Sequence, residues 1–94
     1  MIKSIKNKAL KLLWEKNDES KLPSNQLKKI KVLLQVIDEL EYVPDDLKNL
    51  ISLRPHPLKG NLEGFWSLDV TGNYRIIFRV ENKNAFDVDY LDTH

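Results

Sequence analysis

The chain has 94 residues, of which 41% are apolar and 31% are charged, and its net charge is +1. This length supports one hydrophobic core, so we expect a single domain over residues 1–94. The absence of cysteine excludes disulfides and zinc–thiolate sites. No apolar run approaches the roughly 18 residues of a membrane span, and the N-terminus lacks a signal-peptide core. We therefore expect a cytoplasmic protein with no membrane contact.

The small net charge hides an uneven distribution. Residues 1–31 hold nine lysines and three acidic residues, whereas residues 32–53 hold one lysine and five acidic residues. The basic third of the chain has two interpretations. It is the footprint of a polyanion partner such as RNA, or its lysines only keep the outer faces of helices in water. The sequence favours neither interpretation.

The N-terminal half predicts two amphipathic helices. A short alternating stretch at 2–4 is expected to form a brief edge strand, and a helix is expected over 7–16. A polar connection leads to Ser24, which we expect to cap a second helix over 26–41. The apolar residues of these helices recur at intervals of three and four, and they are Leu10, Leu13, Trp14, Leu27, Ile30, Leu34, Ile37 and Leu40. Such stripes are far more often core than ligand site.

The middle of the chain is irregular and carries one histidine in a stiff frame. A turn or helical fragment is expected across 45–50. His56 then lies between Pro55 and Pro57, and the two prolines favour an extended backbone and remove two backbone donors. We therefore expect His56 to be held in place rather than to lie in a mobile loop.

The C-terminal half predicts a three-stranded antiparallel meander. Two alternating runs flank the loop 71–73, and a third run covers 85–91. An odd-length loop makes Val70 the partner of Tyr74, and we expect Gly72 or Asn73 to supply the positive φ that a three-residue loop needs.

Alternation also assigns side chains to the two faces of this sheet. The apolar face, on which Val80 is expected to pair with Phe86, packs against both helices and produces an α+β fold. The other face has two interpretations. It is a solvated surface with cross-strand ion pairs between Asp69 and Arg75 and between Arg79 and Asp87, or its arginines meet a phosphate. The residues assigned to this outer face are Ser67, Asp69, Arg75, Ile77, Arg79, Asp87 and Asp89.

Chemistry near neutral pH depends on two histidines, His56 and His94. Neither is strong evidence alone, because the first could be a loop residue and the second a frayed end. No metal-ligand spacing, phosphate-binding glycine loop or nucleophile elbow is present. Histidine, lysine and arginine without a metal suit cleavage of a phosphodiester by its own 2′-OH, for which a protein positions RNA, moves protons and stabilises charge.

Segments along essentially the whole chain resemble the HigB toxins of the RelE/ParE superfamily. They are Met1-Ile2-Lys3-Ser4 before a leucine-rich helix, His56-Pro57-Leu58-Lys59-Gly60, Gly64-Phe65-Trp66-Ser67, Gly72-Asn73-Tyr74-Arg75-Ile76, Phe78, and Asp87-Val88-Asp89-Tyr90-Leu91-Asp92-Thr93-His94. The resemblance implies the RelE-like microbial RNase fold and a bacterial type II toxin. Such a toxin is a ribosome-dependent endoribonuclease that cleaves translated mRNA and needs no metal or other cofactor. Its implied partners are the ribosome, mRNA and a HigA-like helix-turn-helix antitoxin. Such a toxin would contact operator DNA only indirectly, through this antitoxin.

The resemblance also implies roles by position. His56 would lie at the scissile bond as a proton-transfer or positioning group, and the rest of the catalytic set would be Lys59 and Arg75 on the phosphate with Asp92 and His94. Further RNA contacts are expected from Arg54, Arg79, Tyr90 and Thr93.

The tail departs from the family's usual Tyr-Glu-Asp-Tyr-His, because Leu91 and Thr93 replace the Glu and the second Tyr. Thr93 has no aromatic ring to stack on a base, so we expect weaker RNA positioning and reduced or altered activity.

Two other functions remain open. A ParE-like member of the superfamily would keep the fold but inhibit DNA gyrase, and the segment 56–60 together with His94 argues against it. A non-catalytic RNA- or protein-binding module would dock a partner on its basic helices, with both histidines incidental. We rank the nuclease first, the binding module second and the gyrase inhibitor third.

Overall fold

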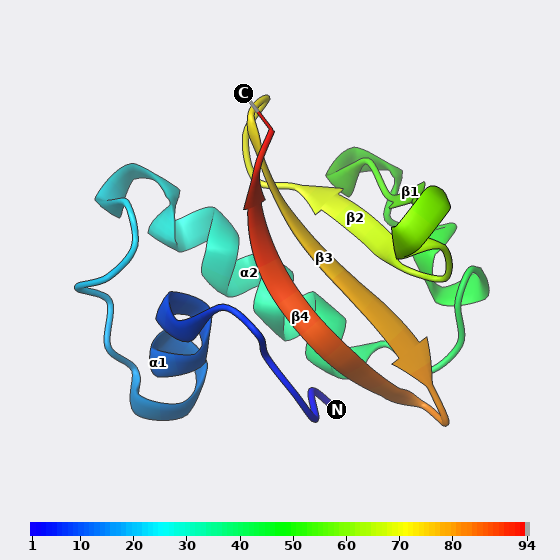
Figure 1. The fold of residues 1–94 in the computed structure, drawn as a ribbon, viewed down its shortest axis with the longest axis horizontal. Helices are drawn as coiled ribbons and strands as arrows, with labels where there is room; N and C mark the ends of the chain where they lie inside the picture. Colours follow the sequence, from blue (N-terminus) through cyan, green and yellow to red (C-terminus); the bar gives the residue numbers. More distant parts are fainter. Residues whose placement is uncertain (94) are drawn as a thin grey trace.

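The computed structural model describes residues 1–93, in which two helices lie on one face of a four-stranded antiparallel sheet of order β1-β2-β3-β4 (Figure 1). The expected α+β fold is confirmed, but the three-stranded meander is corrected, because a short fourth strand pairs with its first strand. None of the helices within these residues is long and apolar enough to cross a membrane. The elements in order are α1 (Lys8–Lys16), η1 (Ser24–Gln26), α2 (Leu27–Glu39), η2 (Asp45–Leu47), η3 (Ile51–Leu53), β1 (His56–Pro57), η4 (Gly60–Leu62), β2 (Trp66–Asp69), β3 (Tyr74–Glu81) and β4 (Asn84–Asp92).

Helix α1 is capped at both ends, by Asn7 and by Asn17. The side chain of Asn7 accepts a hydrogen bond from the Leu10 N–H at 2.9 Å, which satisfies one of the free donors of the first turn. At the other end Asn17 takes a left-handed φ of 55°, and its N–H donates to the Leu13 carbonyl at 3.0 Å. The helix predicted at 7–16 is therefore confirmed.

Helix α2 begins without the predicted side-chain cap. Ser24 opens the 3₁₀ turn η1 and makes no capping hydrogen bond, so the turn itself leads the chain into α2. The helix ends at Glu39, two residues before the predicted end at 41, because the backbone of Leu40 is extended. Its buried face is Ile30, Leu33, Leu34 and Ile37, of which only Leu33 was not predicted.

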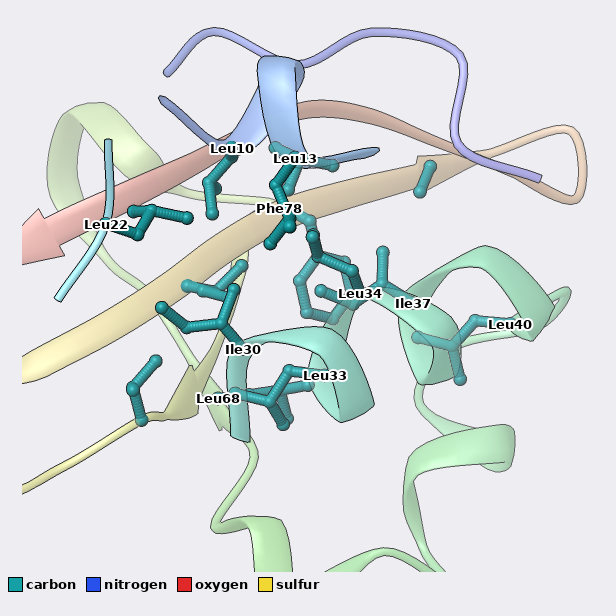
Figure 2. Close-up of a cluster of buried hydrophobic side chains, with 14 of the residues drawn as sticks. Leu10, Leu13, Leu22, Ile30, Leu33, Leu34, Ile37, Leu40, Leu68 and Phe78 are labelled. Carbon is teal, nitrogen blue, oxygen red and sulfur yellow. The ribbon is translucent and has the colours of Figure 1, made fainter. Parts of the chain in front are cut away.

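The helices and the sheet close around one core (Figure 2). Phe78 in β3 is 0% exposed and lies between the two helices. Burial of each large apolar side chain contributes roughly 1.5–3 kcal/mol, so this cluster is the main source of stability. Besides Phe78, the core residues from the sheet are Leu68, Val70, Ile76, Ala85 and Val88.

The loop between β2 and β3 has the predicted length but not the predicted backbone. The Val70 N–H donates to the Tyr74 carbonyl at 2.8 Å, so the expected pair is confirmed. Neither Gly72 nor Asn73 has a positive φ, contrary to our expectation. Thr71 closes the loop instead, since its Oγ1 accepts hydrogen bonds from the N–H groups of Asn73 and Tyr74 at 3.2 and 3.3 Å.

The hairpin between β3 and β4 differs from the prediction by one residue. Val80 pairs with Ala85 and not with Phe86. The reason is a two-residue turn in which Asn82 and Lys83 both have positive φ, 51° and 67°, the geometry of a tight type I′ hairpin.

A β-bulge in β4 restores the predicted faces beyond this turn. The pairing shifts by one residue between Ile77 and Arg79, and Asp87 takes a φ of 55°. The Asp87 N–H donates to the Ser4 Oγ at 2.8 Å. Because of this extra residue, Val88 points to the core and is 0% exposed.

Residues 1–6 run beside β4 and cover that edge of the sheet (Figure 1). Ile2 and Ile5 form isolated parallel bridges with Ala85 and Val88. The Lys3 N–H donates to the Ala85 carbonyl at 2.8 Å. The strand predicted at 2–4 is thus two separate bridges rather than a continuous strand.

Candidate functional site

The candidate site is on the outer face of the sheet, the face turned away from the helices. His56 pairs with Ser67, Ser67 with Ile77, and Ile77 with Asp89, which makes one row across all four strands. Paired residues on neighbouring strands share a face, and the burial of Leu68 in the helix-facing core directs this row outward. β1 therefore carries His56 onto the same face as the polar residues of β2 and β3.

Arg75 occupies the adjacent row of the same face. It pairs with Asp69 on one side and with Leu91 on the other. From strand spacings of about 4.8 Å and a rise of about 3.3 Å per residue, the Cα atoms of His56 and Arg75 lie about 12 Å apart. Two long side chains can approach one phosphodiester group from opposite sides across that distance.

Two arginines converge on the carboxylate of Asp69. The Nε of Arg54 lies 3.4 Å from Oδ2, and the Nε of Arg75 lies 3.6 Å from Oδ1. Arg54 directly follows η3 and has a left-handed φ of 55°, which is uncommon for a residue other than glycine and is often found at functional sites. The predicted pair between Asp69 and Arg75 is confirmed. The contact of Arg54 with Asp69 was not predicted.

The side chains of His56 and Lys59 are both exposed. Pairing of β1 with β2 holds the backbone of His56 extended, as predicted, and the Leu58 N–H donates to the Phe65 carbonyl at 2.9 Å. Within residues 1–93 neither the His56 imidazole nor the Lys59 ammonium has a hydrogen-bond or ion-pair partner. Both groups are therefore available to a ligand.

The centre of the outer face is less solvated than the alternation suggested. Ser67 is 0% exposed and Ile77 is 3% exposed, since both lie on inner strands with neighbours on each side. The Ser67 Oγ is buried and has no hydrogen-bond partner among the described residues. Groups of this kind are rare and often mark a functional position. Its only sequence signal was its place on the polar face, two residues before Asp69.

Arg79 lies toward the other end of the same face and is already engaged. Its Nε is 2.9 Å from the Asp87 carboxylate, and its Nη1 is 2.6 Å from the Glu81 carboxylate. These hydrogen bonds raise the pKa of the Arg79 guanidinium, which also lies 4.9 Å from the centre of the Phe86 ring. The predicted ion pair with Asp87 is confirmed, and RNA binding by Arg79 stays a prediction.

Tyr90 faces the helices and not the row of His56. Its hydroxyl donates to the Gln26 side-chain oxygen, and its ring stacks on Tyr74 with centroids 5.3 Å apart. Burial, followed by the nearby Tyr74 and Asp92, raises the pKa of Tyr90. The structure therefore separates this residue from the other expected RNA contacts, and its own contact stays a prediction.

Thr93, in the C-terminal tail, is hydrogen-bonded to the loop between β2 and β3, which lies next to the end of β4 (Figure 1). The N–H and the Oγ1 of Thr93 both donate to the Asn73 carbonyl, at 2.7 and 2.9 Å. Asp92 ends β4 opposite Tyr74. The prediction for His94 lies outside the described residues.

The lysines of the N-terminal third lie apart from this site. A surface pocket between residues 5–6 and α1 is lined by four lysines together with Glu15 and two apolar side chains; the lysines are Lys6, Lys8, Lys11 and Lys16. Since α1 packs on the helix-covered face, these charges belong to a different surface from His56. Both interpretations of the basic third remain open.

The outer face can bind a phosphate and move protons. Arg54 and Arg75 supply positive charge on either side of the Asp69 carboxylate, Lys59 adds an ammonium group, and His56 adds an imidazole that can transfer protons. Among residues 1–93, no three His, Asp or Glu side chains lie close enough together to hold a metal ion. Basic side chains of this kind stabilise the extra negative charge of a phosphodiester transition state.

Comparisons with known proteins give matches over nearly the whole chain. The family model described as the RelE-like toxin of the type II toxin-antitoxin system HigB matches residues 3–94. The Endoribonuclease HigB of Proteus vulgaris is 42% identical over 94 residues, which cover 100% of both chains.

Solved structures share the fold. YafQ from E. coli strain BL21(DE3) has a TM-score of 0.52 at 18% identity, over 98% of this chain and 93% of its own. The YoeB/ParE toxin from Agrobacterium tumefaciens also has a TM-score of 0.52 at 18% identity, over 100% of this chain and 99% of its own. At these identities the two structures support the fold alone, and the predicted RelE-like fold is confirmed.

Proposed function

Because this chain belongs to the RelE-like HigB toxins of type II toxin-antitoxin systems, we propose that it is an endoribonuclease that cleaves translated mRNA on the ribosome. The observation that carries this proposal is the pair of neighbouring rows on the outer face, one with His56 and one with Arg75. The relative named Endoribonuclease HigB supports the type of reaction. Cleavage of messages under translation stops protein synthesis.

The reaction proceeds by attack of the RNA's own 2′-OH. The 2′ oxygen forms a bond to the adjacent phosphorus, the bond from phosphorus to the 5′ oxygen breaks, and a cyclic phosphate and a free 5′-OH result. One group must take the 2′ proton and another must give a proton to the leaving oxygen. We assign these two transfers to His56 and His94, because histidine exists in both protonation states near neutral pH. Asp92 completes this proposed catalytic set.

Charge on the phosphate is balanced by the basic side chains and no metal is used. Arg75 and Lys59 neutralise the non-bridging oxygens as negative charge develops on them, and Arg54 adds a second guanidinium beside Arg75. Thr93 lacks an aromatic ring for the base, so binding depends more heavily on these phosphate contacts.

A toxin of a type II system has an antitoxin partner. We propose that this partner is a HigA-like helix-turn-helix protein, and that the toxin reaches operator DNA only through it.

Primer extension on a defined mRNA with purified ribosomes tests the proposal. Wild-type protein is expected to cut only when ribosomes are present, His56→Ala to abolish the cuts and Arg75→Ala to weaken them. Lys48→Ala is the matched control, because it removes an exposed charge paired with Asp45 outside the site, and its cuts should equal those of the wild type. Folded wild-type protein that cuts nothing would refute the nuclease, and cuts without ribosomes would refute ribosome dependence.

A further inference from the structure

We propose that Asp69 is a positioning residue that holds Arg54 and Arg75 as a clamp for an RNA phosphate. We call Arg54, Asp69 and Arg75 the phosphate clamp. The inference rests on the proposed nuclease function and assigns a task to a carboxylate that would otherwise only repel a polyanion.

Within the phosphate clamp, each guanidinium contacts Asp69 through its Nε, the nitrogen nearest the side-chain stem. Both arginines approach Asp69 through Nε, at 3.4 Å for Arg54 and 3.6 Å for Arg75. Within residues 1–93 their terminal amino groups make no hydrogen bond. Guanidinium groups bind phosphate in a bidentate manner through N–H groups in a planar fork. The carboxylate therefore orients both forks and leaves their outer amino groups to the ligand.

Burial supports an orienting role for this carboxylate. The Oδ1 of Asp69 and the Nε of Arg75 are both buried, and neither has a hydrogen-bond partner at the 3.6 Å that separates them. Contacts in ligand-free sites are often long and tighten in the complex with substrate. A phosphate bound to the outer edge of Arg75 would complete the coordination of this guanidinium.

Charge and backbone conformation support the same role. Two guanidinium groups on one small surface repel each other, and the carboxylate between them offsets that repulsion. The side chain of Arg54 is 72% exposed, so without Asp69 nothing described in the structure restricts its rotamers. Arg54 also takes an unfavourable left-handed φ of 55°, and strain of this kind is typically retained where function requires it.

The ion pair between Arg79 and Asp87 provides a contrast on the same face. There the guanidinium uses a terminal amino group for Glu81 as well as Nε for Asp87. Its outer edge is therefore occupied by protein. Asp87→Asn removes the same charge, from the same face and from the same type of pair, but outside the phosphate clamp.

Binding and cleavage by matched variants test the role of Asp69. The binding probe is a ribosome programmed with mRNA that carries 2′-deoxyribose at the cleaved nucleotide, so that it lacks the nucleophile. We expect Asp69→Asn to weaken binding about tenfold, the loss of one charge-assisted contact, and to lower the salt slope by about 1. Cleavage of the all-ribose message by Asp69→Asn should show a lower kcat and a higher KM than cleavage by the wild type. Asp69→Glu should bind with intermediate affinity, because it keeps the charge and shifts the contacts by one methylene.

The sign of the effect decides between positioning and simple repulsion. Removal of a negative charge would by itself strengthen binding to RNA, so Asp87→Asn should bind as the wild type does or slightly tighter. Tighter binding by Asp69→Asn, or equal losses in both variants, would overturn the inference. If Asp69→Asn does not fold, wild-type affinity in Asp69→Glu would overturn it. A wild-type protein that neither binds nor cuts would refute the proposed function instead.

Discussion

We predict that removing the buried side-chain oxygen of Ser67 stabilises the protein. Its hydroxyl is fully buried, and the structure offers it no hydrogen-bond partner among the described residues. Folding therefore strips water from this hydroxyl without replacing the lost hydrogen bonds. We expect Ser67→Ala to raise the free energy of unfolding, whereas most buried truncations lower it.

Two terms of opposite sign set the magnitude. Leaving a buried polar group unsatisfied costs roughly 1–3 kcal/mol, which Ser67→Ala recovers. Removal of one oxygen leaves a cavity of about 15 Å³, which at about 24 cal/mol per Å³ costs roughly 0.4 kcal/mol. A net gain of about 1 kcal/mol follows, which corresponds to a rise in Tm of roughly 4–8 °C for a domain of this size.

Urea unfolding at constant m-value measures this change, and Ser4→Ala is the matched control. The Oγ of Ser4 accepts the hydrogen bond from the N–H of Asp87 at 2.8 Å, so the same deletion of oxygen should destabilise by about 1 kcal/mol. A loss of stability in Ser67→Ala, of the size found for Ser4→Ala, would refute the reasoning. Because Ser67 pairs with His56 across β1 and β2, cleavage by the variant should be measured alongside its stability.

Two further predictions concern stability. Tyr90→Phe leaves the buried side chain of Gln26 without its partner hydroxyl, so we expect a loss of about 1–3 kcal/mol in urea unfolding; unchanged stability would contradict this. The N–H groups of Tyr42 and Glu41 lower the pKa of Asp46, so its stabilisation is present above the ordinary carboxyl pKa and is lost as the pH falls through the lowered value. Asp46→Asn should therefore destabilise the protein at pH 7, and the difference from wild type should shrink below about pH 4. A difference that does not depend on pH would argue against this.

Elements with long periodic patterns were predictable from the sequence. Helix α2 and the pairing of β2 with β3 each repeat their apolar residues over several periods, so packing against a common core leaves few alternatives. The strand β1 has two residues, and its partners in β2 lie nine and eleven positions away in the sequence. A pattern this short carries no periodicity.

Backbone conformation explains the errors in register and in caps. Asn82, Lys83 and Asp87 all take positive φ without a glycine at any of the three positions, so the usual sequence sign of a tight turn and bulge is missing. Ser24 has a side chain suited to capping, but the backbone passes through a 3₁₀ turn first.

The candidate site was predictable where it depends on alternation and not where it depends on tertiary contacts. Alternation alone placed Asp69 opposite Arg75. The approach of Arg54 requires an arginine with a left-handed backbone, which propensity disfavours. The burial of Ser67 requires strands on both sides, one of which was not predicted.

The pairing of residues 1–6 with β4 also constrains when this protein can fold during its synthesis. Ile2 pairs with Ala85 and Ile5 with Val88. Residues 1–6 leave the ribosome first, but they cannot form these bridges until β4, near the end of the chain, has been synthesised. Ala85 and Val88 are themselves part of the core, and contacts so distant in sequence are formed late because loop closure comes first. A nascent chain therefore leaves part of the apolar core uncovered until β4 has emerged. The sheet of this toxin, together with the N-terminal segment that covers its β4 edge, is therefore complete only after translation of its own message has passed Val88.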